Sequence, residues 1–201
     1  MSYSNFAAFY DKLQSDVDYA ARANVLLNLF EKYDRLPTLL LDMACGTGGF
    51  SEQFLKFGID VIGVDPSPEM LSVAREKLYN NGNSPLLLCQ SAAELDLYGT
   101  VDGAICCLDS LNHITSIKNL KKAISKVSLF LEKDGLFIFD MNTVYKHEKI
   151  LADNVFVKEN DDVFCVWQNR YDKRKRSTEI MLDFFVTREN GYERFSENDK
   201  G

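Results

Sequence analysis

The sequence lacks the features that would tie it to a membrane, a metal ion or a disulfide framework. None of its apolar runs approaches the roughly 18 residues that a membrane-spanning helix needs. Its first residues, MSYSNFAAFYDKL, contain no basic segment followed by an apolar one, so we expect no signal peptide. Only two histidines and five cysteines occur, and no CxxC pair is present. We therefore predict reduced, mostly buried thiols in a cytoplasmic protein and no metal site.

Basic charge is also in short supply. The chain has 201 residues, and its 23 Lys and Arg against 30 Asp and Glu give a net charge of -7. A field of that sign repels phosphate backbones, so nucleic acid is a disfavoured partner and a small molecule is the expected one. The length suits one domain with room for a small subdomain.

The first two thirds of the chain alternate short apolar runs with helical patterns. The apolar runs, which we interpret as buried strands, cover 38–43, 59–65, 85–90, 101–108 and 135–141. Helices are expected over 5–33, with a break near Ser15, and over 48–57, 66–82 and 116–132. Continuous apolar strands alternating with helices predict an α/β fold, in which a doubly wound parallel sheet is covered on both faces.

After residue 150 the pattern changes to a period of two. The runs DDVFCVWQNRY and STEIMLDFFVTR flank the polar segment DKRKR, and a third short run, GYERF, follows. This alternation predicts an antiparallel hairpin or three-stranded ribbon, with DKRKR as a solvated tip. We therefore expect two parts, residues 1–150 and residues 151–201.

The stretch LLLDMACGTGGF, residues 39–50, carries the clearest functional signal. A strand that ends in a glycine-rich turn and opens a helix is the nucleotide-binding corner of a doubly wound sheet. Glycines there let the backbone approach a ligand closely. Asp65 lies 19 residues after Gly46, at the end of the second strand, where an acid commonly bonds ribose hydroxyls. The dinucleotide pattern GxGxxG would need a glycine where this chain has Ser51.

The turn begins with an acid, and in this it resembles the first motif of the class I S-adenosylmethionine-dependent methyltransferases. Asp42, Ala44, Gly46 and Gly48 fit that motif, with Ala44 in place of its first glycine. GVDPSPEML (63–71), CQSAAELDL (89–97) and CLDSLNHI (107–114) are similar to the second, third and fourth motifs, and the N-terminal segment resembles the helical lid of small bacterial members. The resemblance spans about residues 3–141, and the lid would comprise residues 1–33.

This resemblance implies S-adenosylmethionine as the methyl donor. The residues that it places around the donor are Tyr10, Tyr19, Asp42, Ala44, Gly46, Gly48, Asp65, Pro66, Met70, Gln90, Ser91, Ala92 and Asp109. Ser91 stands where the family often has an acid for the adenine amino group, and Gln90 or a main-chain carbonyl is the expected substitute.

No catalytic residue is assigned, and Asp109 and His113 are the only candidates. Simpler roles stay open: a helix N-cap for Asp109, a structural or exposed position for His113, and packing for Tyr10 and Tyr19. Asp65 and the glycines likewise allow a purely structural reading, as a helix cap and plain turn residues.

The family completes its sheet with a sixth and a seventh strand, which we do not find in this chain. We predict five parallel strands in the order 3-2-1-4-5, and residues 162–187 as an antiparallel subdomain near the carboxyl ends of strands four and five. There it would help to form the acceptor site. The edge of strand five would be uncovered, and we expect the chain to be a C-terminally shortened version of a longer one; a partner chain on that edge and the hairpin folding back onto it are the alternatives. The predicted function is methyl transfer to an unidentified, small-molecule acceptor. Two alternatives remain at this point: an NAD(P)-dependent oxidoreductase, against which Ser51 and the acid-first motif stand, and a non-catalytic methyltransferase-like binding domain.

Overall fold

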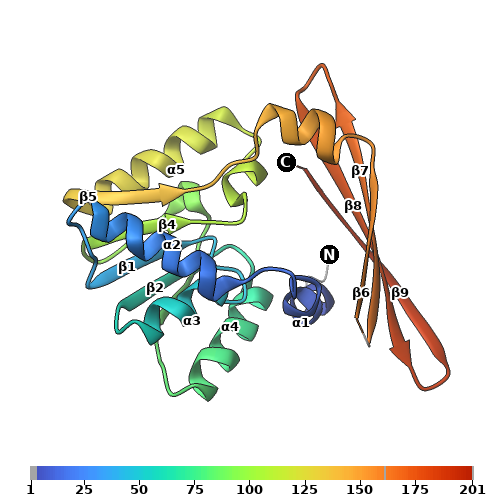
Figure 1. Ribbon diagram of the computed structural model, residues 1–201, viewed down its shortest axis with the longest axis horizontal. Coiled ribbons are helices and arrows are strands. Elements are labelled where there is room, and N and C mark those ends of the chain that lie inside the picture. The colour runs from blue at the N-terminus through green and yellow to red at the C-terminus, as the bar shows by residue number, and fades with distance from the viewer. Residues whose placement is uncertain (1–3, 161, 201) are drawn as a thin grey trace.

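The structure, a computed structural model, describes residues 4–160 and 162–200, so the first three residues of the expected lid lie outside it. It contains a five-stranded parallel sheet and a separate four-stranded antiparallel sheet (Figure 1). The parallel sheet has the order β3-β2-β1-β4-β5, as predicted. The elements of this half are α1 (Ser4–Leu13), α2 (Tyr19–Lys32), β1 (Leu39–Met43), α3 (Gly49–Lys56), β2 (Asp60–Asp65), α4 (Pro68–Asn80), β3 (Leu86–Cys89), β4 (Val101–Cys106), α5 (Ile117–Phe130) and β5 (Leu131–Phe139), with two short 3-10 helices, η1 (Ala92–Glu94) and η2 (Ser110–His113).

Local sequence signals explain where the helices begin. Asp18 is the N-cap of α2 and accepts a hydrogen bond from the N–H of Ala21; the helical segment is interrupted between Leu13 and Tyr19, which includes the break expected near Ser15. Ser67 caps α4 by accepting from the N–H of Met70, with Pro68 in the first turn. These caps place both helices close to the predicted boundaries.

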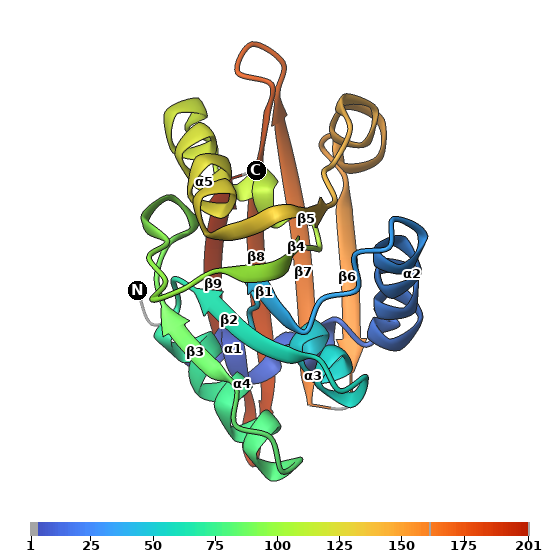
Figure 2. The same cartoon turned by 90° about the vertical axis from the view of Figure 1, so that its left-hand side faces the viewer.

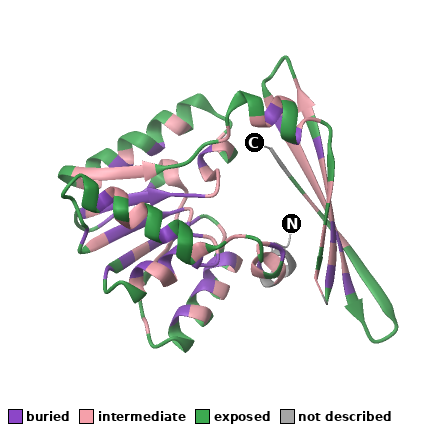
Figure 3. Cartoon of the chain, in the orientation of Figure 1, coloured by how far each residue is buried: buried purple, intermediate pink, exposed green. Residues whose placement is uncertain are grey.

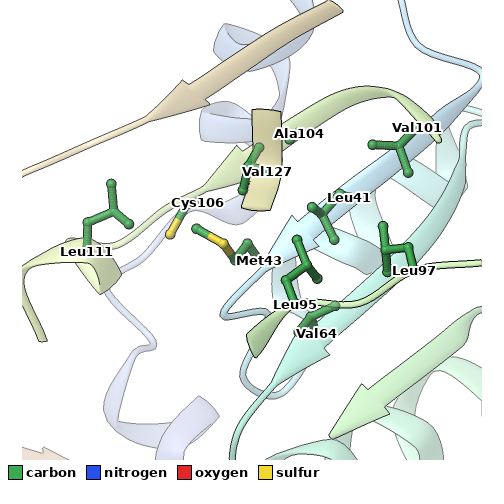
Figure 4. Close-up of a cluster of buried hydrophobic side chains, with 10 residues drawn as sticks. All are labelled: Leu41, Met43, Val64, Leu95, Leu97, Val101, Ala104, Cys106, Leu111 and Val127. Carbon is green, nitrogen blue, oxygen red and sulfur yellow. The ribbon is translucent and has the colours of Figure 1, made fainter. Parts of the chain in front are cut away.

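Two apolar clusters cover the two faces of the parallel sheet. One lies between the sheet and α5, and its members include Leu41, Met43, Val64, Ala104 and Val127 (Figure 4). The other packs α2 and α3 against the opposite face and includes Ala23, Phe30, Leu40, Phe54 and Ile105. Successive residues of β1 therefore point into different clusters, which is why its sequence is apolar without alternation. The carboxyl ends of β1, β2 and β4 come together at one edge of this layer (Figure 2).

The four-stranded sheet has the order β6-β7-β8-β9 and does not pair with β5. Its strands are β6 (Val155–Asn160), β7 (Val163–Asp172), β8 (Ser177–Arg188) and β9 (Gly191–Lys200), preceded by a one-turn π-helix, η3 (Lys146–Leu151). It is larger than the predicted hairpin or ribbon, because β6 adds a strand and β9 runs past the GYERF segment. Within the described residues β4 is the only strand that pairs with β5.

Helix α1 lies between the two sheets (Figure 1). Phe9 and Leu13 pack against a cluster on the antiparallel sheet that includes Cys165, Phe184 and Phe195. The burial pattern shows the result: the central strands β1, β2 and β4 of the parallel sheet are mostly buried, whereas its edge strands β3 and β5 and most of the antiparallel sheet are half-buried or exposed (Figure 3). None of the helices in the described ranges combines the length and apolarity needed to cross a membrane.

Candidate functional site

The turn after β1 uses the left-handed backbone region at every second residue. Ala44, Gly46 and Gly48 have φ angles of 59°, 54° and 77°, which are the three alternate positions of the first motif. For Ala44 this conformation costs on the order of 1 kcal/mol. A Cβ built on Gly46 would meet no atom within 4 Å. The space beside Gly46 is therefore open, and a ligand can approach its backbone.

Asp65 braces this turn from the end of β2. Its Oδ2 accepts the N–H of Gly46 at 2.9 Å, and its Oδ1 accepts the N–H of Ser67, also at 2.9 Å. The side chain is only 8% exposed, and burial raises its pKa, against the opposing effect of the two N–H donors. A carboxylate has about four lone-pair sites, so two amide bonds leave capacity to accept hydroxyl groups. The N-cap of α4 is Ser67, so Asp65 is not the helix cap considered from the sequence; it positions the cap residue, and its side chain is not used up.

Asp42 is buried more deeply, at 2% exposed, and accepts a 2.6 Å hydrogen bond from the Ser51 hydroxyl. Burial raises its pKa from the ordinary 3.8 to about 7, the negative charge of Asp65 adds to this, and the Ser51 bond opposes it. Ser51 is the residue that breaks the dinucleotide pattern. The structure gives that departure a reason, since a glycine there would leave the Asp42 carboxyl without its hydroxyl donor.

Asp11 of α1 is bound to the glycine turn by a hydrogen bond and to α4 by an ion pair. The Thr47 hydroxyl donates to Asp11 Oδ1 at 2.5 Å, and the Lys77 ammonium lies 2.5 Å from Asp11 Oδ2. On the same helix, burial raises the pKa of Tyr10 to about 12, and the carboxylates of Asp109, Asp11 and Asp65 add to the rise. Tyr10 is therefore brought close to the acids of the site and keeps its proton at neutral pH.

Tyr19 occupies a packing position. A Cβ on Gly49 would lie 2.5 Å from its ring, and the ring meets Phe50 edge-on with centroids 5.2 Å apart. The phenol also feels the negative charge of Asp42, which together with burial raises its pKa. The packing alternative for Tyr19 is thus realised beside the turn.

The second and third motifs line the carboxyl ends of β2 and β3. Met70 is buried, Pro66 is exposed, and Ala92 packs on the cluster of Figure 4. Gln90 uses both ends of its amide on one backbone: its Oε1 accepts the Asp96 N–H at 3.0 Å, and its Nε2 donates to the Asp96 carbonyl at 3.2 Å. The Gln90 side chain therefore holds this loop closed, and the choice between Gln90 and a main-chain carbonyl as the substitute for the family's acid stays a prediction.

Ser91 is engaged within its own short helix. Its hydroxyl donates to Glu94 Oε2 at 3.2 Å, and its side chain makes no capping bond to η1. It is half-buried, in line with the end of β3.

The fourth motif forms a second strained turn. Leu108 and Asp109 both have positive φ, 57° and 52°, and both donate their N–H to Asp140, at 3.0 and 2.6 Å. Asp109 stands at the N-cap position of η2 but makes no side-chain capping bond, and its Oδ2 instead accepts from Asn142 Nδ2. His113 ends η2 and is exposed.

Asp140 and Asn142 were missed by the sequence analysis. Asp140 directly follows β5 and Asn142 lies two residues further on, so the rule that singled out Asp65, a polar residue at a strand's carboxyl end, would have found this segment. Asp42, Asp65, Asp109 and Asp140 thus give the carboxyl edge of the sheet a concentration of negative charge suited to a cationic ligand. Of these acids, Asp65 adjoins the open space at Gly46, and its charge suits a donor that carries a sulfonium and an ammonium group.

Comparison with known proteins agrees with this geometry. A sequence model of the family described as "Methyltransferase domain" matches residues 40–135. YqeM of Bacillus subtilis (strain 168), which is named only as a candidate methyltransferase, is 30% identical over 199 residues, covering 98% of this chain and 78% of YqeM.

Two solved structures extend the comparison. The crystal structure of an S-adenosylmethionine-dependent methyltransferase from Clostridium acetobutylicum ATCC 824 is 35% identical, with a TM-score of 0.87 over 98% of this chain and 80% of that one. S-adenosylmethionine-bound CalS10, an amino pentose methyltransferase from Micromonospora echinaspora, has the same fold at 20% identity, with a TM-score of 0.77 over 100% and 82% of the two chains. These matches decide against the oxidoreductase alternative, and the chain belongs to the class I S-adenosylmethionine-dependent methyltransferases.

Proposed function

We propose that the carboxyl edge of the parallel sheet binds S-adenosylmethionine and that a small-molecule acceptor enters between this edge and the antiparallel sheet. The observation that carries the donor site is the open space beside Gly46, whose N–H is bonded to Asp65. In this proposal Gly46 allows close approach, Asp65 accepts ribose hydroxyls, and Asp42 and Asp109 attract positive charge. The other donor contacts expected from the motifs, including Pro66, Met70, Gln90, Ser91 and Ala92, remain predictions.

The bound donor supplies a methyl group already activated by its sulfonium. The protein's tasks are therefore to position the acceptor in line, to exclude water and, for some acceptors, to remove a proton. Tyr10 is unsuited to be the base at neutral pH, because its raised pKa keeps the phenol protonated. It is suited to donate a hydrogen bond toward the acids that surround it.

Several features support a small acceptor. Helix α1, attached through Asp11 to the glycine turn, stands between the donor edge and the antiparallel sheet, as a lid would. The net charge of -7 opposes a nucleic-acid substrate. CalS10, of the same fold, acts on an amino pentose, which is a small molecule. We further propose a division near residue 150, at η3, and a cytoplasmic location, which the five free cysteines favour.

The donor site is tested with a matched pair of glycine variants. Gly46 and Gly58 both have positive φ, 54° and 79°, and a Cβ on either would meet no atom within 4 Å. Changing each to alanine imposes a similar strain of about 1 kcal/mol, but only Gly46 lies at the proposed site. We expect calorimetry to show a loss of donor affinity of tenfold or more for Gly46→Ala and little change for Gly58→Ala.

Equal affinities in the two variants would rule out a close approach of the donor to this turn. The acceptor proposal has its own measurement, the transfer of labelled methyl to small amines and alcohols compared with RNA and protein. Transfer confined to a macromolecule would contradict it.

A further inference from the structure

A chain of hydrogen bonds runs from Asp109 to the antiparallel sheet. Asn142 Nδ2 donates to Asp109 Oδ2, and the Asn142 backbone N–H donates to Asn112 Oδ1 at 2.8 Å. Asn112 Nδ2 lies 3.4 Å from His147 Nε2, and His147 Nδ1 lies 2.7 Å from the Thr178 hydroxyl. Five residues, brought from η2 and its N-cap, the segment after β5, η3 and β8, thus form one connected series, which passes through the backbone of Asn142.

The far end of this chain is fixed in the protein interior. Thr178 is fully buried at 0% exposed, and His147 is 9% exposed. His147 lies on η3, the helix that joins the two sheets in Figure 1. At the near end, Asp140 holds the backbone of Asp109 through its N–H. The backbone of Asp109 is therefore held by Asp140, which follows β5. The carboxylate of Asp109 is held by the series of hydrogen bonds that begins in β8.

The donors and acceptors fix the protonation of His147. Asn112 Oδ1 is taken by a backbone N–H, so the amide group facing His147 is its NH₂, which can only donate. His147 Nε2 must then accept and carry no proton. The proton of the neutral ring is on Nδ1, which donates to Thr178. A protonated ring would set two donors against each other at Nε2 and break the link to Asn112.

We propose that Asn142, Asn112 and neutral His147 are positioning residues, through which the antiparallel sheet holds the Asp109 carboxylate in the donor site. The inference rests on the proposed function in one respect, that Asp109 contacts the donor. It gives the antiparallel sheet a role in donor binding in addition to the acceptor-side role expected from the sequence.

The charges around His147 favour the neutral ring. Burial lowers its pKa, the Asp109 carboxylate raises it, and the Lys146 ammonium lowers it. From β8 the ring meets the uncharged hydroxyl of Thr178, and on β7 the phenol of Tyr171 donates to Glu148 of η3. The balance leaves His147 neutral at pH 7.

Nitrogen-15 NMR tests the protonation directly, because the chain has only two histidines. A His113→Gln variant leaves the signals of His147 alone. We expect the Nδ1–H tautomer and a pKa below 6.5 in the wild-type sequence. An Nε2–H tautomer, or a ring that is protonated at pH 7, would overturn the proposal.

In an Asn112→Asp variant, the group that faces His147 Nε2 is a hydrogen-bond acceptor instead of a donor. Its carboxylate still accepts the Asn142 N–H but now needs a proton from His147, so we expect the pKa of His147 to rise above 6.5. Protonation of Asp42 near pH 7 should weaken donor binding in both proteins. A further loss of donor affinity as pH falls through the pKa of His147 should appear in wild-type protein and not in this variant. Asn119→Asp is the matched control, because Asn119 is exposed on α5 and the change adds the same charge. An equal rise of the His147 pKa in Asn112→Asp and Asn119→Asp would contradict the proposed series of hydrogen bonds.

A double-mutant cycle links the series to the donor. We expect Asp109→Asn and Asn142→Ala each to weaken donor binding by about tenfold, and the double variant to be no weaker than Asp109→Asn alone. If the loss of donor affinity in the double variant equals the product of the two single losses, Asn142 does not act through Asp109. If Asp109→Asn binds the donor normally while Gly46→Ala does not, the donor site stands and this inference fails. If neither variant loses affinity, the proposed site itself is wrong.

Discussion

The buried carboxyl of Asp42 makes the sharpest stability prediction, which the change Asp42→Asn tests. Asparagine keeps the shape of the side chain and can still accept the Ser51 hydroxyl, but it cannot ionise. Any difference between the two proteins that depends on pH then reports the ionisation of this one group.

The size of the effect follows from the pKa. A rise from the ordinary 3.8 to about 7 corresponds to about 4 kcal/mol, at 1.36 kcal/mol per pH unit. Below about pH 4 both folded and unfolded chains hold the proton, and the group has no effect. Between about pH 4 and 7 only the folded chain holds it, so stability falls as pH rises. Above pH 7 the folded chain bears the full cost of a buried charge.

Urea denaturation from pH 5.5 to pH 8 measures this cost. We expect Asp42→Asn to be more stable than wild type by 2–4 kcal/mol at pH 8, as an order of magnitude, and the difference to narrow by roughly 1.4 kcal/mol for each pH unit below 7. The same variant should bind the donor more weakly, because the negative charge is gone. A difference that does not change with pH, or a less stable variant at pH 8, would refute the assignment of a raised pKa to Asp42.

Two further variants test contacts around the same turn. Asp11→Ala removes the contacts of α1 with Thr47 and Lys77 and should lower donor affinity. Because the ion pair is partly exposed, the free energy of unfolding should change by less than about 1 kcal/mol. Unchanged donor affinity in calorimetry would show that α1 does not contribute to the donor site. Ser51→Gly introduces the third glycine of the dinucleotide pattern but removes the hydroxyl that donates to Asp42. Denaturation should therefore show that this variant loses more stability than wild type as pH rises to 8. Measurable NAD binding by the variant would contradict our interpretation of Ser51.

The parallel sheet was predictable because its central strands β1, β2 and β4 are buried on both faces, and its edge strands β3 and β5 are also short apolar runs bounded by turns. Leu40 and Leu41 enter different clusters, and a strand of this kind is an uninterrupted apolar run that stands out in the sequence. Strand β6 was missed for the opposite reason. VFVKEN is short and lies at the edge of its sheet, where Val155 and Val157 remain more than half exposed, so its alternation carries little burial signal.

The residues of the candidate site also fall into two groups, those that local sequence predicts and those that it does not. The turn at 44–48 and Asp65 are fixed by local geometry, a strand end and a tight turn, and local sequence reports both. The engagement of Gln90 with Asp96, the packing of Tyr19 on Gly49 and the series through His147 depend on segments that meet only in the folded chain. Nothing in the neighbourhood of these residues in the sequence distinguishes their roles.

Strain and unfavourable charge gather at the residues that the donor is proposed to contact. Ala44 and Asp109 hold left-handed backbone conformations, and Asp42 and Asp65 hold carboxylates whose pKa is raised by burial. Each of these features lowers the stability of the ligand-free protein. A cationic ligand would offset the electrostatic destabilisation, because its positive charge lowers the pKa values of the acids. Donor binding near pH 7 should therefore release protons from the protein, and it should stabilise the fold most at alkaline pH, where the buried charge costs most.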